Sequence, residues 1–96
     1  MSDKELYRQK RQAQLDQWRA EVDKLKAKAS GVSADVQLEM NQHIKGLESK
    51  IEEGKLKLSQ LVAASDEAWE SMKDGVESAW ETLKSAAGDA ATKFKK

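Results

Sequence analysis

An eleven-residue unit recurs through the last third of the sequence. It reads Ala68-Trp69-Glu70-Ser71-Met72-Lys73, then Ala79-Trp80-Glu81-Thr82-Leu83-Lys84, and continues as Ala90-Ala91-Thr92-Lys93-Phe94. Because eleven residues complete three helical turns at about 3.67 residues per turn, equivalent positions return to one side of a helix with little drift. The repeat therefore predicts a helix with an apolar stripe, and such a stripe needs a packing partner.

The composition extends this helical prediction to the whole chain. Alanine, glutamate, lysine, leucine and arginine account for 49 of the 96 residues, and proline is absent. This composition is typical of long helices and coiled coils. We expect one all-α domain over residues 1–96, built from long amphipathic helices and without strands. A chain of this size buries a small fraction of its surface, so partners would stabilise it.

A single apolar seam can be traced from Trp18 to Phe94 in alternating steps of three and four residues. Gly54 and Ser65 interrupt the seam. Steps of this kind place apolar side chains on one face of a helix. We predict that the helix-packing interface consists of Trp18, Val22, Leu25, Ile44, Leu47, Ile51, Leu58, Leu61, Trp69, Met72, Val76, Trp80 and Leu83.

Two architectures fit this seam, and they differ at two possible breaks, residues 30–33 and 63–66. If both breaks are turns, three helices of about equal length fold as an antiparallel three-helix bundle. If the helix instead continues through residues 30–33, it is roughly 60 residues and about 90 Å long, and it forms a self-associating coiled coil or helical hairpin. We favour the long helix, because glycine inside a helix costs only about 1 kcal/mol and no proline enforces a turn. A long helix cannot cover its own stripe, so this reading requires a homo-oligomer.

The charge distribution is uneven although the net charge is zero, with 17 basic and 17 acidic residues. The first third of the chain is basic and the last third is acidic. This asymmetry mildly favours antiparallel packing of the first third on the last. The zero net charge and the lack of a recognisable motif give no reason to expect nucleic acid as a partner.

Residues suited to catalysis are scarce. His43 is the one histidine, cysteine is absent, and no nucleophile, phosphate-loop or metal-ligand motif is present. Glu48, Glu52 and Glu53 share a side of a helix but lack the histidines of a di-iron bundle. We expect no enzymatic activity, no cofactor and no metal. The sequence also lacks a signal peptide and an apolar run long enough for a transmembrane segment, so we expect a cytoplasmic protein.

The three tryptophans admit two interpretations. They can pack in a helix–helix seam, or they can dip into a peripheral lipid or hydrophobic granule surface. Surface-binding helices usually carry many lysines and arginines on the polar face, whereas the stretch around Trp69 and Trp80 is acidic. Packing is therefore the favoured interpretation, with surface adsorption as the alternative.

Two stretches carry a resemblance to a known family. They are Leu15-Asp16-Gln17-Trp18-Arg19-Ala20-Glu21-Val22-Asp23-Lys24-Leu25-Lys26-Ala27-Lys28-Ala29 and the segment from Ala64-Ser65-Asp66-Glu67-Ala68-Trp69 through Ala79-Trp80. Together they resemble a family of small bacterial coiled-coil proteins, some of which are described as stress-response proteins. The resemblance implies a non-enzymatic, self-associating coiled-coil protein with a structural or stress-related role. By period alone, the repeat is also similar to apolipoproteins, desiccation-protection proteins and the phasins of polymer granules.

Overall fold

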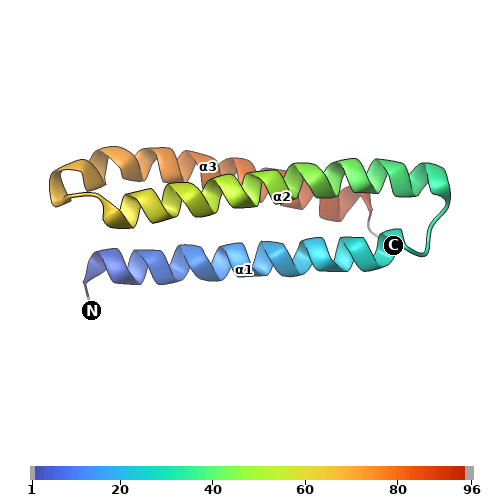
Figure 1. Ribbon diagram of the computed structural model, residues 1–96, viewed down its shortest axis with the longest axis horizontal. Helices are drawn as coiled ribbons and strands as arrows, with labels where there is room; N and C mark the ends of the chain where they lie inside the picture. The colour runs from blue at the N-terminus through green and yellow to red at the C-terminus, as the bar shows by residue number, and fades with distance from the viewer. Residues whose placement is uncertain (1, 95–96) are drawn as a thin grey trace.

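The computed structural model describes residues 2–94, and over this range the protein consists of helices and short connections (Figure 1). The helices are α1 (Asp3–Ala29), α2 (Ala34–Ala63) and α3 (Asp66–Lys93). They lie side by side and give an elongated bundle of 51 × 21 × 17 Å. The prediction of an all-α fold is confirmed.

Local sequence signals explain where the helices begin. The Ser2 hydroxyl accepts a hydrogen bond from the Glu5 amide, and the Ser65 hydroxyl accepts one from the Ala68 amide. Both serines cap the first turn of a helix in this way. The Ser33 side chain makes no such bond at the start of α2. The two outer helices are therefore capped at their N-termini by serine side chains, and α2 is not.

The chain turns at residues 30–33 instead of continuing as one helix. The uninterrupted helix of some 60 residues, which we favoured from sequence, is not formed. Turning lets α1 lay Leu15, Val22 and Leu25 on α2 within the same chain. Full burial of one aliphatic side chain contributes about 1.5–3 kcal/mol, whereas a backbone hydrogen bond contributes about 0.5–1.5 kcal/mol. Burial of several side chains therefore outweighs the few helical hydrogen bonds lost at the turn.

The expectation that the first third packs antiparallel to the last third is wrong. α1 and α3 run parallel: Lys4 pairs with Asp66 at their N-terminal ends, and Lys28 donates to the Phe94 carbonyl oxygen at their C-terminal ends. Two short connections make neighbouring helices antiparallel, so the first and third helices must point the same way. Surface ion pairs, worth about 0.2–1 kcal/mol each, are too weak to override that connectivity.

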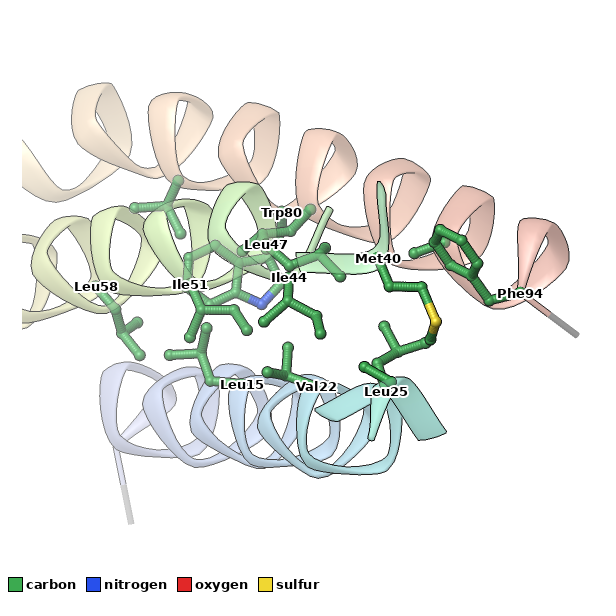
Figure 2. Close-up of a cluster of buried hydrophobic side chains, with 14 of the residues drawn as sticks. Leu15, Val22, Leu25, Met40, Ile44, Leu47, Ile51, Leu58, Trp80 and Phe94 are labelled. Carbon is green, nitrogen blue, oxygen red and sulfur yellow. The ribbon is translucent and has the colours of Figure 1, made fainter. Parts of the chain in front are cut away.

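α2 is the central helix of the bundle. It packs extensively on both α1 and α3, while α1 and α3 meet only sparsely. Figure 2 shows side chains from all three helices converging in one core. The buried apolar side chains are Leu15, Val22, Leu25, Ala29, Met40, Ile44, Leu47, Ile51, Leu58, Leu61, Val76, Trp80, Leu83, Ala90 and Phe94. Among the described residues no polar or charged residue is buried.

Candidate helix-packing site

The eleven-residue repeat sets which side of α3 faces the core. In the units 69–79 and 80–90, the first, fourth, eighth and eleventh positions are all buried or half-buried. These positions hold Trp69, Met72, Val76 and Ala79 in the first unit and Trp80, Leu83, Ala87 and Ala90 in the second. Most other positions are exposed. The sequence period is therefore also the period of burial.

All thirteen residues of the predicted interface lie in or against the core. Ten are buried: Val22, Leu25, Ile44, Leu47, Ile51, Leu58, Leu61, Val76, Trp80 and Leu83. The other three, Trp18, Trp69 and Met72, are partly buried and pack against the same cluster. The structure thus brings the interface residues together within one chain.

Some core residues were absent from the predicted interface. Leu15 and Met40 are almost completely buried, and Phe94 closes the core at the end of α3. Gly54 is buried as well, against Trp80 and Leu83. Gly54 continues the three-and-four spacing, so the signal was present in the sequence. It interrupts the chemical pattern of the seam but not the packing.

Aromatic side chains fill the space between α1 and α3. Tyr7 meets Trp69 edge to face with ring centroids 5.4 Å apart, and Trp18 meets Trp80 with centroids 6.1 Å apart. Arrangements of this kind add about 0.5–1.5 kcal/mol to the burial of the rings. We call these four residues the aromatic cluster. They pack α1 against α3, two helices that otherwise meet sparsely.

Three cations lie over the rings of the aromatic cluster. The Arg11 guanidinium carbon is 5.1 Å from the Tyr7 centroid and 5.7 Å from the Trp80 centroid. Lys4 Nζ is 5.5 Å from the Trp69 centroid, and Lys73 Nζ is 5.4 Å from the Tyr7 centroid. These separations are within the range of cation–π attraction. Two basic residues of α1, Lys4 and Arg11, and one of α3, Lys73, therefore contact aromatic rings.

Hydrogen bonding contributes little within and around the aromatic cluster. Tyr7 Oη, Arg11 Nε and Trp80 Nε1 are buried, and none of them bonds another protein group. Arg11 donates instead through Nη1 to the Gln14 side chain, at 2.9 Å. Within the aromatic cluster the α1–α3 contact is therefore held by ring packing and cation–π attraction, whereas Lys4–Asp66 and Lys28 with the Phe94 carbonyl oxygen join the two helices at their ends.

Ion pairs join the helices along their exposed edges. Arg19 on α1 pairs with Glu52 on α2 at 2.7 Å, and Lys26 on α1 pairs with Glu48 on α2 at 2.8 Å. Hydrogen bonding and charge attraction from Arg19 lower the pKa of the Glu52 carboxyl. The same two effects of Glu48 raise the pKa of the Lys26 ammonium.

A third such pair joins α3 to α2. Lys93 lies 2.5 Å from Glu39, and its hydrogen bond and charge lower the pKa of the Glu39 carboxyl. These side chains are largely exposed, so their contribution to stability is small. The three ion pairs instead help to fix how the helices are aligned along their length.

His43 packs against an aromatic ring. It meets Phe94 edge to face with centroids 5.2 Å apart. Across residues 2–94 the structure contains no group of three or more histidine, aspartate or glutamate side chains placed to hold a metal ion. No helix within the same range is long and apolar enough to span a membrane.

Comparison with known proteins identifies the repeat. Residues 69–79 and residues 80–90 each match the TMP repeat. The chain carries a known helical repeat. The two matched units are the ones whose first, fourth, eighth and eleventh positions face the core. No curated protein and no solved structure matches the chain.

Proposed function

We propose that this is a non-enzymatic helical repeat protein that self-associates and acts through helix–helix assembly. The observation that carries the proposal is the seam. Apolar side chains follow it through all three helices and the first connection, and the TMP repeat supplies its last part. A seam that packs helices within one chain can pack the same helices between two chains.

Four large apolar side chains outside the core support self-association. Leu6 is 51% exposed, Val36 39%, Leu38 65% and Leu56 59%. A slender bundle that leaves these side chains in water gains stability when a second copy covers them.

Solution mass tests the proposal directly. Light scattering on the purified protein, from micromolar to millimolar concentration, should show species heavier than the 10.7 kDa chain. A constant mass of one chain over that range contradicts self-association. The stress-related role rests on the family resemblance. It is tested by comparing the growth of cells that carry the gene with the growth of cells that lack it, both under stress and without stress.

Surface adsorption is the second candidate function, favoured by the aromatic cluster. Tyr7, Trp18 and Trp69 are only partly buried, and Lys4, Arg11 and Lys73 lie over rings of the cluster. Aromatic residues beside cations suit the boundary between water and an anionic surface. Tryptophan emission should shift to the blue when anionic phospholipid vesicles are added. The absence of a shift with anionic vesicles and with hydrophobic granules rejects this candidate.

A further inference from the structure

The apolar seam has one gap in the folded bundle. Ala29, Val32, Val36 and Met40 continue it across the first connection in steps of three and four. Ala29 and Met40 are buried and Val32 is half-buried, whereas Val36 is 39% exposed. Apart from the polar Ser65, Val36 is the exposed member of a seam that is otherwise covered. The seam is therefore not fully satisfied by a single chain.

The register of α1 on α2 shows where Val36 would lie if two straight helices paired. The Arg19–Glu52 and Lys26–Glu48 pairs define that register, and the midpoint of each pair falls close to Val36. Suppose residues 3–63 formed one straight helix, and two such helices paired antiparallel in the same register. The twofold axis would then pass close to Val36. The two Val36 side chains would cover each other.

Two hydrogen bonds of the first connection run back into α1. The Gly31 amide donates to the Lys28 carbonyl oxygen at 3.1 Å, and the Ser30 hydroxyl donates to the Ala27 carbonyl oxygen at 2.7 Å. Ser30 has helical backbone angles, φ −69° and ψ −15°, and no described residue has a positive φ. The Ser33 side chain makes no cap bond, and the first backbone hydrogen bond of α2 runs from Gln37 to the Ser33 carbonyl oxygen. In a continuous helix the preceding amides would gain carbonyl partners four residues back.

The second connection differs in the side-chain bonds that hold it. The Ser65 hydroxyl caps the Ala68 amide, and Ser65 places a polar residue at the seam position. Lys4 also donates to the Ala64 carbonyl oxygen at 2.8 Å. Straightening this connection would break these bonds and gain no apolar contact. The first connection is the one suited to open.

From these observations we infer that the protein dimerises by domain swapping through residues 30–33. The connection straightens, α1 and α2 merge into one helix, and α1 of each chain packs on the α2–α3 hairpin of a second copy. This inference rests on the proposed self-association and names its partner and route. The swapped dimer keeps the contacts of α1 with α2 and α3, now between chains. Its additional gain is the hydrogen bonding of the straightened connection and the burial of Val36.

Cross-linking with isotope labels distinguishes the swapped dimer from other dimers, using the unmodified sequence. Unlabelled and ¹⁵N-labelled protein are unfolded together, refolded at high concentration and treated with a carbodiimide, which joins a lysine to a carboxylate in direct contact. In the swapped dimer, Lys26–Glu48 and Lys4–Asp66 cross-links include light–heavy pairs. Lys93–Glu39, within the α2–α3 hairpin, and Lys57–Glu53, within α2, stay within one chain.

Two substitutions in the connection should move the monomer–dimer equilibrium in opposite directions. Gly31→Ala favours the straight helix by about fivefold for each connection, and its β-carbon meets only ordinary contacts in the turn. Ser33→Pro suits the turn, because the φ of Ser33 is −62° and its side chain caps nothing. A proline in the middle of a continuous helix should disfavour the dimer by more than about a hundredfold for each chain. Ser65→Pro, at the other connection, is the matched control and should leave the dimer fraction near the unmodified level.

A charge at the predicted twofold axis gives an independent test. Val36→Glu places an acidic residue in the first turn of α2, three positions after Ser33, which suits the single-chain bundle. In the swapped dimer the two carboxylates would face each other, and the dimer fraction should fall by about tenfold or more. Leu38→Glu makes the same change at a side chain that points elsewhere, and the dimer should tolerate it.

The outcomes separate this inference from the proposed function. A dimer whose Lys26–Glu48 cross-links never mix labels, or one lost with Leu38→Glu and kept with Val36→Glu, overturns domain swapping while self-association stands. A dimer insensitive to Ser33→Pro also overturns it. Failure of both the unmodified protein and Gly31→Ala to dimerise overturns the inference and the proposed function together.

Discussion

Trp80 on α3 packs directly over Gly54 on α2, so closely that a β-carbon there would be in tight contact with it. A β-carbon built on Gly54 would lie 3.2 Å from Cζ3 of Trp80 and 3.1 Å from Cδ1 of Leu83. Because Gly54 has no side chain, the Trp80 indole can enter the core at this point of α2. Gly54, which interrupts the apolar seam in the sequence, is thus the position on α2 against which Trp80 packs.

This relationship predicts that Gly54→Ala will not stabilise the protein as alanine normally does in a helix. Replacing an exposed helical glycine by alanine stabilises by about 1 kcal/mol. At Gly54 the added methyl group overpacks the core, a change that typically costs about 1–3 kcal/mol. Urea denaturation followed by circular dichroism measures the difference. The control is Gly75→Ala, because nothing lies within 4 Å of its β-carbon position. Equal stabilisation by both substitutions would contradict the tight packing at Gly54.

The two repeat tryptophans should differ in their contribution to stability. Trp80 is 3% exposed, whereas Trp69 is only partly buried. Trp80→Ala should lower the free energy of unfolding by about 3–5 kcal/mol, and Trp69→Ala by clearly less. Chemical denaturation of each variant gives both values. A larger loss for Trp69→Ala would mean that the first repeat unit, not the second, anchors α3.

Stability should decline on the acid side because of Glu39 and Glu52. The pKa of each carboxyl is lowered from its usual value of 4.5 by a lysine or arginine on a neighbouring helix. Their contribution is present above pH 4.5 and is lost as the pH falls through the lower folded-state values. The midpoint of thermal unfolding should depend less on pH below 4.5 in the Glu39→Gln/Glu52→Gln variant. Glu77→Gln removes a carboxylate that forms no ion pair in the described chain, and should leave the acid profile unchanged.

Phe94 should hold the last turns of α3 in place. It is 9% exposed, and its ring meets His43. Phe94→Ala should cost about 3 kcal/mol, the lower end of the range for a buried phenylalanine, since a helix end can fray. Amide hydrogen exchange should show faster exchange over residues 88–92 with little change around Trp80. Uniform acceleration along α3 would show instead that Phe94 supports the whole helix.

Much of the fold can be predicted from residues that are close together in the sequence. The three-and-four spacing placed Val22, Ile51 and Leu83 on the core side. Serine, a residue that favours helix N-caps, stands at positions 2 and 65, where the structure shows capped helix starts. These signals depend on residues within a few turns of each other. They are readable without knowing the tertiary arrangement.

The choice at residues 30–33 could not be read in the same way. Gly31 lowers helix propensity only slightly, so local preference left both architectures open. The deciding term is the burial of α1 side chains such as Leu15 on α2, which is a long-range contact. The stacking of Arg11 between Tyr7 and Trp80 likewise depends on the register of α1 and α3, which no short sequence window encodes.

The repeat in α3 also makes the bundle modular in length. Each eleven-residue unit advances a helix by about 16.5 Å. It turns the inward face by only about 20°, since eleven residues at about 3.6 residues per turn slightly exceed three full turns. Adding one such unit to each of the three helices would lengthen the bundle by one increment and keep the inward faces aligned. Length and packing face are therefore independent variables in this architecture, and longer bundles can arise by duplication without a new core.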